Sequence, residues 1–352
     1  MNEGWNGAVA DLFRAIRIDS PHELTLGGRK FAAPAAAAPP PAPPGLGGAP
    51  PAAQAPLLGM LNNVLYHHVY SRSFRGRLAA AVPGETAHEA FTPDRELMAR
   101  LAAANGTRDR WEHGWQVGQL LPMGQVLAVR GSARRTVWPG QFLSKDGPGM
   151  RPRQGMQISL FYPKESASLQ PGFYYVFGET PEDESHGFGL VRAYWNVDAG
   201  GAPDLVRLLS ERLNRFHVPF RFKCSVVRSQ YERTDVAVVY FAKRFFPVFA
   251  DLLCDIQPRL RAALGDDVPL FAKPLAAGVG IAEDPGTGES FGQHRCRILA
   301  ETLWNCFLNG NQSLSARLTE LGRLLDANGV DARQLHLNAG SLDWYELPAA
   351  IA

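Results

Sequence analysis

The sequence is poor in cysteine and in net charge, and each shortage excludes a class of protein. Its four cysteines are scattered, with no CxxC pair and no second Cys/His pair at zinc-finger spacing. This argues against a structural zinc site and a disulfide framework, and it favours a reducing compartment. The formal net charge of +2, without any Lys/Arg run with interleaved aromatic residues, argues against nucleic acid or an anionic membrane surface as a partner.

Long hydrophobic runs are missing as well. The first 31 residues lack the continuous apolar core of a signal peptide, and nowhere do 18 strongly apolar residues follow one another. We therefore expect a cytoplasmic protein with no membrane partner. The sequence also lacks GxGxxG and GxxxxGK[ST] patterns, a Ser–His–Asp order, an HExxH motif and paired carboxylates. Nucleotide-binding, hydrolase and metalloenzyme interpretations thus receive little support.

The chain divides into three predicted segments. Its 352 residues, 45% of them apolar, are enough for a sizeable core. Residues 1–31 form an N-terminal helical segment, with a short helix expected at Val9–Ile16. Residues 32–56 are rich in Ala and Pro and carry no charge, so little offsets their ordering entropy and we expect a flexible, partly polyproline insert. A proline-rich ligand for an SH3-like partner is the functional alternative. Residues 57–352 form the main domain.

Periodicity within the main domain predicts an α+β fold. Short runs of β-branched and aromatic residues between Trp111 and Phe177, separated by Gly and Pro, are typical of a β-meander. Apolar residues at helical spacing predict helices on both sides of it, at residues 57–70, 93–105, 204–216, 244–264, 294–307 and 313–328. We expect a mixed or antiparallel β-sheet core with packed helices.

The stretch from Arg192 to Tyr240 holds the first candidate site. It predicts a strand, a helix and two further strands, and in one of these Lys223 lies on the face opposite the phenylalanines. A lysine near Arg192 and Tyr194 could bind an anion or abstract a proton. The alternative is a solvated lysine on the outer face of a sheet.

The helix at residues 294–307 offers a second candidate. Its first turn presents His294, Arg295 and Arg297, which is unfavourable against the helix dipole unless an anion is bound there. Salt bridges to nearby acidic residues are the alternative, with Glu283, Asp284 and Glu289 as the partners.

Four separated segments resemble the HopA-type effector domain family. They are RAYWNV from Arg192, LNRFHVPFRFK from Leu213, YERTDVAVVY from Tyr231 and SFGQHRCRILAE from Ser290. Members of this family occur as type III secretion effectors of plant pathogens. They also occur in gene clusters for ribosomally made, modified peptides such as class V lanthipeptides and thioamide-containing peptides.

That family is distantly similar to the phosphothreonine lyases, so the resemblance implies a lyase-like fold and a phosphate elimination that needs no metal or organic cofactor. In those lyases a lysine removes the α-proton, a histidine protonates the leaving phosphate and arginines hold it. The base position falls on Lys223 and the acid position on Tyr194. The phosphate-binding positions fall on Arg192, Arg233, Tyr240 and Arg295.

Tyr194 is the departure from the lyase pattern, because a phenol is a poorer acid than imidazolium near neutral pH. The acid could instead be His186, His217 or His294. Two functions follow from the resemblance. One is a phosphoserine/phosphothreonine lyase that makes dehydroalanine or dehydrobutyrine in a precursor peptide phosphorylated by a partner kinase-like phosphotransferase. The other is a non-catalytic phosphopeptide-binding protein or a type III effector, secreted into a host, that engages a host target.

Overall fold

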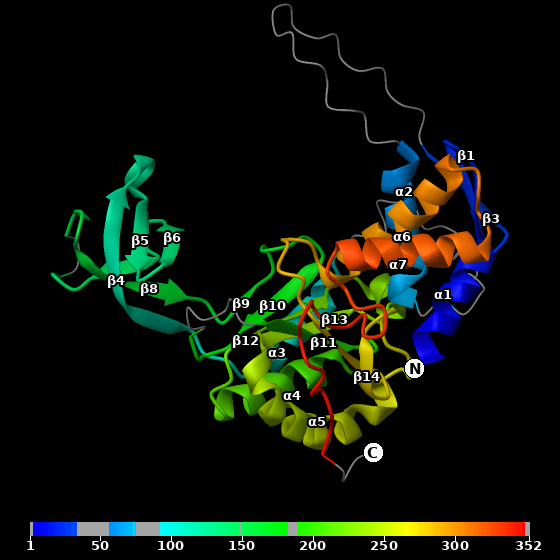
Figure 1. Ribbon diagram of the computed structural model, residues 1–352. Coiled ribbons are helices and arrows are strands. Elements are labelled where there is room, and N and C mark those ends of the chain that lie inside the picture. Colours follow the sequence, from blue (N-terminus) through cyan, green and yellow to red (C-terminus); the bar gives the residue numbers. More distant parts are fainter. Residues whose placement is uncertain are drawn as a thin grey trace, which may run out of the picture.

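The structure is a computed structural model that describes residues 3–33, 56–72, 74, 92–147, 150–181 and 189–348. Most of the predicted Ala/Pro insert (34–55) and the candidate His186 lie outside these residues. The described part is α+β, and all strand pairs in its three sheets are antiparallel, which confirms the predicted fold class (Figure 1).

Seven α-helices are described, and caps account for where several of them begin. Asp94 accepts from the Leu97 amide, and Ser290 forms a capping box with Gln293. The helices are α1 (Glu3–Ala15), α2 (Pro56–His68), α3 (Arg95–Ala104), α4 (Ala202–Arg215), α5 (Phe246–Leu260), α6 (Phe291–Leu308) and α7 (Leu314–Ala327).

A seven-stranded sheet forms the centre of the molecule. Its strands, in spatial order, are β14 (Lys273–Ala276), β15 (Val279–Glu283), β11 (Leu190–Trp195), β13 (Ala237–Ala242), β12 (Phe220–Ser225), β10 (Phe173–Phe177) and β9 (Glu165–Ser166). The alternation of Phe220, Phe222 and Cys224 with polar residues puts one side of β12 into the core.

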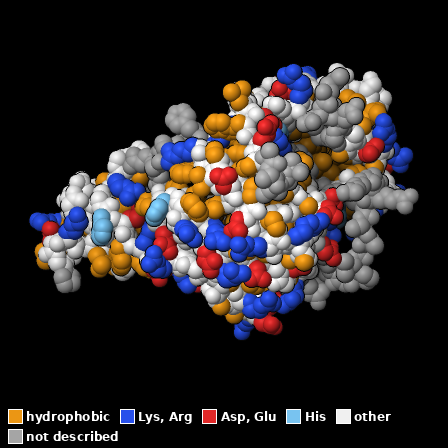
Figure 2. All heavy atoms as spheres, turned by 90° about the horizontal axis from the view of Figure 1, so that it is seen from below, with side chains coloured by type: hydrophobic (Ala, Val, Ile, Leu, Met, Phe, Trp, Pro, Cys, Tyr) orange, Lys and Arg blue, Asp and Glu red, His pale blue; other side chains and the backbone are white. Residues whose placement is uncertain are grey.

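Helices cover the two faces of this sheet differently. On the apolar face, α3, α4 and α5 bury a continuous core that includes Trp195 and Phe222. The outer surface of α4 and α5 mixes acidic and basic side chains (Figure 2). On the other face, α2 and α6 join Tyr194, Val238 and Tyr240 in a second core.

A five-stranded sheet with its own small core stands beside the main body (Figure 1). Its strands, in spatial order, are β6 (Ala133–Val137), β5 (Val126–Arg130), β4 (Arg110–Leu120), β8 (Gln157–Tyr162) and β7 (Phe142–Ser144). The predicted meander is therefore divided, because its first part forms this sheet while β9 and β10 join the central one.

The N-terminal segment differs from the predicted helical one. After α1 the chain forms a three-stranded sheet of β1 (Ile16–Ser20), β2 (Glu23–Leu26) and β3 (Arg29–Ala32). Residues with turn propensity, Ser20-Pro21 and Gly27-Gly28, separate these strands. The strands are only four or five residues long, too short for periodicity to reveal them.

Candidate functional site

One face of the central sheet brings together four of the predicted site residues. Residues opposite each other in an antiparallel pair point to the same face. One row across the strands is Ala282, Arg192, Tyr240, Arg221 and Phe177. The row beside it is Gly280, Tyr194, Val238, Lys223 and Tyr175. Arg192, Tyr194, Lys223 and Tyr240 thus share this face, which we call the site face.

Lys223 is half-buried on the site face rather than fully solvated. Its Nζ donates to Oε1 of Gln170 at 3.2 Å and lies 4.4 Å from the centre of the Phe173 ring. Burial and the charge of Arg192 lower the pKa of Lys223 to about 8. A lysine with this pKa is unprotonated in a useful fraction of molecules near neutral pH, as a general base must be.

Arg192 and Arg221 flank the ring of Tyr240, one on each neighbouring strand. Their Cζ atoms lie 5.1 and 5.6 Å from its centre, which is cation–π distance. Asp284 accepts from Nε of Arg192 at 2.8 Å and also from its Nη2. The arginines are therefore held in place, and Arg192 already has a carboxylate partner.

Arg233 reaches the site face from the segment before β13. It forms a bidentate pair with Asp235, with both N–O distances 2.8 Å. Tyr66 of α2 donates to Asp235 at 3.1 Å and accepts from Arg233 at 3.3 Å. Burial opposes ionisation of Asp235, but Arg233 outweighs it and holds the pKa of this carboxyl below its usual value. Both groups also act on the pKa of Lys223, Arg233 lowering it and Asp235 raising it.

Tyr194 lies under an aromatic layer instead of at the surface. It is 3% exposed, and its ring centre is 6.5 Å from that of Phe291. Its hydroxyl lies near that of Tyr70 but makes no hydrogen bond of ordinary geometry within the described residues. Burial raises the pKa of Tyr194 to about 12, although Arg192 and Tyr70 oppose the rise.

The structure does not bring Arg295 to the site face. Arg295 is 2% exposed, and its nitrogens donate to the carbonyls of Leu335 and Leu337 at 2.9 and 3.0 Å. Its third nitrogen is 2.7 Å from Nδ1 of His294. Its guanidinium therefore fixes the segment after α7. Of the salt bridges expected as the alternative at this helix end, the one between Arg297 and Glu289 is present, at 3.0 Å. Glu283 and Asp284 pair with Lys243 and Arg192 instead.

The alternative acids within the described residues also lie elsewhere. His294 is buried in α6, where burial and Arg295 lower its pKa to about 4. His217 lies in the turn that joins α4 to β12, with a φ of 53°. Among the predicted residues on the site face, Tyr194 and Tyr240 carry hydroxyls. Tyr240 belongs to the row that holds Arg192 and Arg221, which we call the arginine row, and Tyr194 belongs to the row beside it.

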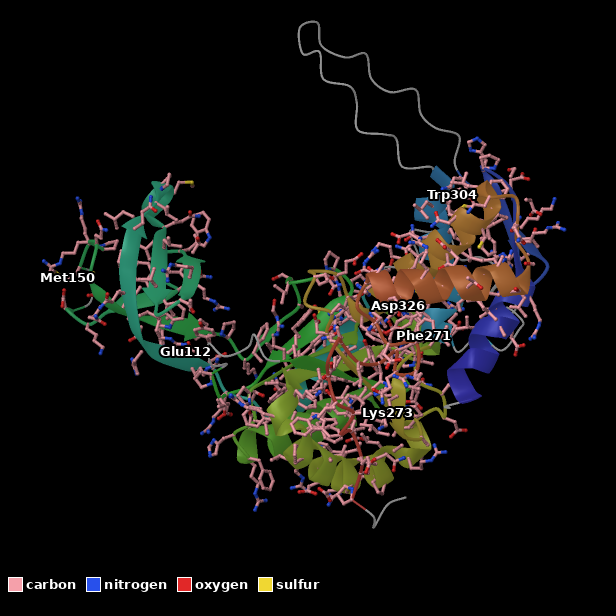
Figure 3. The ribbon with its side chains drawn as sticks, in the orientation of Figure 1. Glu112, Met150, Phe271, Lys273, Trp304 and Asp326 are labelled. Carbon is pink, nitrogen blue, oxygen red and sulfur yellow. The ribbon has the colours of Figure 1, made fainter. Side chains whose placement is uncertain are left out.

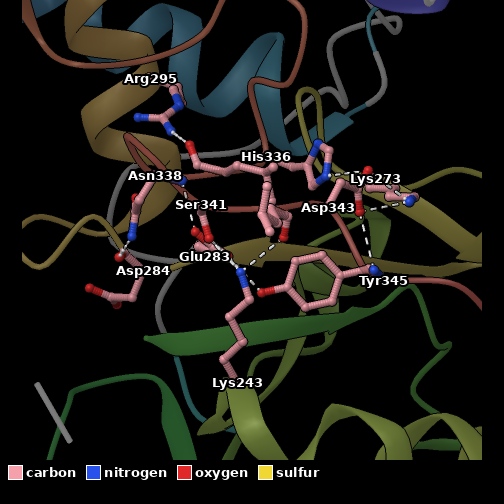
Figure 4. A network of polar contacts seen from close by, with 12 residues as sticks. Lys243, Lys273, Glu283, Asp284, Arg295, His336, Asn338, Ser341, Asp343 and Tyr345 are labelled. Carbon is pink, nitrogen blue, oxygen red and sulfur yellow. Dashed lines mark hydrogen bonds and ion pairs between the residues drawn. The ribbon is translucent and has the colours of Figure 1, made fainter. Parts of the chain in front are cut away.

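A polar network behind the site face positions Asp284 (Figure 4). The neighbouring Glu283 is buried and accepts from Lys243, Tyr345 and the Asn338 amide at 2.5, 2.8 and 2.8 Å. Asn338 also donates to the Asp284 carbonyl at 2.6 Å. The C-terminal segment thereby fixes the end of β15 and, through it, the partner of Arg192.

Sequence reasoning missed the residues that contact Lys223, Tyr194 or the arginines of the site. They are Tyr66, Tyr70, Gln170, Asp235 and Asp284. The spacing of Tyr66 and Tyr70 puts them on one helix side, and Asp235 alternates with Arg233, but neither pattern says which sheet face they meet. The arginines of the site, Arg192, Arg221 and Arg233, outnumber its two carboxylates, so the surface around Lys223 is cationic. Such a surface suits binding of a phosphorylated group and removal of a proton beside it.

The described residues offer neither a metal-binding cluster nor a membrane-spanning helix. No group of three or more His, Cys, Asp or Glu side chains there could hold a metal ion. No helix in the same part of the chain is both long and apolar enough to cross a bilayer.

The chain resembles some solved structures and one protein family. No curated protein matches the sequence. The solved structures that resemble the chain include the effector protein from Pseudomonas syringae pv. tomato strain DC3000, with a TM-score of 0.43, 17% identity, and coverage of 79% of this chain and 90% of that one. Another is the effector protein from Pseudomonas syringae pv. syringae strain 61, with a TM-score of 0.41, 13% identity, and coverage of 80% and 95%.

The family comparison covers the central sheet together with α4, α5, α6 and α7. Residues 164–337 match the model of the HopA1 effector protein family. The matched segment begins at β9 and ends in the segment that Arg295 fixes, so it contains every residue of the site face. This segment of the chain is therefore similar to the HopA1 effector protein family.

Proposed function

We propose that the protein is a phosphoserine/phosphothreonine lyase that acts on a ribosomally made precursor peptide. A partner kinase-like phosphotransferase would first phosphorylate Ser or Thr. This protein would then eliminate the phosphate to leave dehydroalanine or dehydrobutyrine. The observation that carries the proposal is Lys223, half-buried with a pKa of about 8 among the guanidinium groups of neighbouring strands.

Each site residue has a role in this elimination. Unprotonated Lys223 takes the α-proton, the released electron pair forms the Cα–Cβ double bond, and the Cβ–O bond breaks. Phosphate leaves with that bond's electron pair and takes a proton from the Tyr194 hydroxyl. A phosphate trianion is itself a strong base, so a phenol with a raised pKa still suffices as its proton donor. No metal or organic cofactor takes part.

The arginine row provides the phosphate-binding side. Arg192 lies one strand from Tyr240 and two from Arg221, so a phosphate over the Tyr240 ring would meet guanidinium groups from both directions. Electrostatic stabilisation of the charge that develops on a leaving group often lowers the barrier more than any other single effect in an active site. Asp284 and Asp235 hold Arg192 and Arg233 in place before substrate arrives, and phosphate must compete with these carboxylates.

Lys223→Ala tests the assignment of the base. The purified protein is incubated with a phosphothreonine peptide. Mass spectrometry then distinguishes the phosphorylated, dehydrated and unmodified forms of the peptide. We expect the variant to lose dehydration by at least 100-fold and to accumulate phosphopeptide. Lys145→Ala, at an exposed lysine that follows β7 of the five-stranded sheet, is the matched control. Accumulation of unphosphorylated peptide, or unchanged dehydration, would show that Lys223 is not the base.

A second function is favoured by Tyr194 and by the family. The phenol replaces the acid histidine, and the matched family consists of effector proteins. A non-catalytic phosphopeptide-binding protein, or a secreted effector that engages a host target, would use the arginines without turnover. Intact phosphopeptide after prolonged incubation, with an affinity that falls in Arg233→Ala, would favour this function over the lyase.

A further inference from the structure

A large basic pocket lies next to the site face. It has a volume of about 580 Å³ and is bounded by the five-stranded sheet on one side and by β9, β10 and β12 on the other. Its charged lining is five arginines and one carboxylate: Arg110, Arg130, Arg134, Arg135, Arg221 and Glu112. We call this the arginine pocket. Glu112 lies where the five-stranded sheet approaches the main body, and Met150 lies at the far end of that sheet (Figure 3).

Aromatic rings hold three of the arginines in the pocket in place. Arg110 and Arg135 lie over the Tyr162 ring, at 4.7 and 4.4 Å from its centre. Arg130 lies 4.7 Å from the centre of the Trp115 ring. Stacking on a ring restricts a guanidinium while leaving its edge able to donate to an anion.

The pocket keeps a surplus of positive charge. Glu112 is 6% exposed, and its carboxylate forms ion pairs with the guanidinium groups of both Arg110 and Arg130, at 2.9 and 3.2 Å. Even with Arg221 left out of the count, the described residues of the lining set one carboxylate against four guanidinium groups, so charge complementarity favours an anionic ligand.

The backbone around the pocket favours an extended peptide as that ligand. Within the described residues, β6 and β9 are end strands of their sheets, and both contribute to the lining through Arg134, Arg135 and Ser166. An end strand presents backbone groups with which another extended chain can pair. The glycines of the sequence form no nucleotide phosphate loop.

We propose that the arginine pocket binds an acidic, extended segment of the peptide that the protein acts on. Arg221 lines the pocket and also belongs to the arginine row of the site face, so it joins the two regions. A peptide held along β6 by its acidic residues would continue past Arg221 towards Lys223. This proposal rests on the proposed function only in treating the bound peptide as the substrate.

Fluorescence anisotropy with the full chain tests the proposal without any turnover. The probe is a labelled, unphosphorylated peptide of alternating Glu and Thr, about ten residues long, so that it spans the two end strands. Its charge control has Gln in place of Glu. We expect the Gln peptide to bind at least tenfold more weakly. The double variant Arg134→Glu/Arg135→Glu should weaken binding of the Glu peptide at least tenfold. Arg151→Glu/Arg153→Glu, at exposed arginines between β7 and β8, should change the affinity for the Glu peptide less than twofold.

Two further measurements keep the test decisive. Arg135→Gln keeps the test valid if charge reversal misfolds the double variant. Its neutral side chain neither repels the acidic probe nor forms ion pairs with the pocket's other arginines, and we expect it to weaken binding several-fold. Hydrogen exchange should show protection of residues 133–137 when the Glu peptide is bound. Equal affinity for the Glu and Gln peptides, no loss in Arg135→Gln, or tighter binding of a single-stranded oligonucleotide that competes for the pocket would overturn the proposal.

Failure of this proposal and failure of the lyase would look different. Intact dehydration together with charge-independent peptide binding would reject the acidic-peptide pocket alone. Charge-dependent binding without any dehydration would reject the lyase alone.

Discussion

At the scale of single residues, the lowered pKa of Lys223 predicts a stability gain when its charge is removed. The folded-state pKa of about 8 lies below the unfolded value of about 10.4, so folding disfavours the charged lysine at every pH below about 8. We expect Lys223→Met to raise the free energy of unfolding at pH 7 by about 2 kcal/mol, after discounting for partial exposure. The gain should shrink as the pH rises from about 8 to 10.5. Urea unfolding at pH 7 and at pH 10 measures both, and a loss of stability at pH 7 would contradict a depressed pKa.

Tyr194 gives the corresponding prediction for the acid. General acid catalysis contributes about 10² to 10⁴ in rate, and a phenol with a raised pKa belongs at the low end. Tyr194→Phe keeps the buried ring and removes only the proton donor. We expect dehydration to slow by about 100-fold while phosphopeptide affinity stays within twofold.

The control for this variant is Tyr70→Phe, which removes the neighbouring hydroxyl in the same aromatic layer. Its dehydration rate should change by less than threefold. Equal rates in Tyr194→Phe and the unaltered protein would mean that phosphate leaves without a proton from this residue.

The sequence correctly places Lys223 but does not reveal its environment. Alternation with Phe222 and Cys224 predicts the face on which it lies. The groups that set its pKa are Arg192, Asp235 and Arg233, after burial. These come from other strands and loops, and periodicity carries no information on which of them meet.

At the scale of elements, helices were easier to predict than the roles of their residues. The period of apolar residues and the capping box both indicate α6. The same period could not show that Arg295 faces the segment from Leu335 to Leu337, because that segment has no regular structure of its own. The sequence alone therefore allowed Arg295, near the start of a helix, to be interpreted as an anion ligand.

The contacts of Arg295 predict that replacing it lowers the stability of the fold and leaves phosphate binding intact. Arg295→Met should lower the free energy of unfolding by about 2 to 4 kcal/mol, because two carbonyls lose a charged donor in a buried place. Arg297→Met, which removes a partly exposed salt bridge on the same helix, should cost at most about 1 kcal/mol. Chemical denaturation and phosphopeptide titration separate the two effects. A large loss of phosphopeptide affinity with normal stability would restore Arg295 to the binding site.

At the scale of the whole molecule, the sequence indicates the fold class but not how the three sheets assemble. The runs that predict a meander contribute to two sheets, and the arginine pocket arises only where those sheets approach each other. Its arginines are spread over the sequence from Arg110 to Arg221, so no local motif marks them. A site of this kind depends on assembly, and a single sequence gives few signals for assembly.

The N-terminal segment is joined to the far end of the chain by one buried arginine. Arg317 of α7 donates to the carbonyls of Phe13 and Ile16, the latter at 2.7 Å. Gln312 exchanges two hydrogen bonds with the Ile18 backbone at 3.1 and 2.9 Å. The end of α1 and the start of β1 therefore depend on donors from the other end of the sequence.

Arg317→Leu should loosen this segment before the rest of the molecule. Two carbonyls would lose their donor in an apolar setting, which costs about 2 to 4 kcal/mol. Because Arg317 and Gln312 hold the start of β1, we expect the amides of β1, β2 and β3 to exchange with solvent at least tenfold faster, while those of the central sheet keep their rates. Arg323→Leu, at an exposed salt bridge on the same helix, should leave both sets unchanged. Equal acceleration throughout would mean that the N-terminal segment and the central sheet unfold as one cooperative unit, since the lost contacts would then destabilise every amide alike.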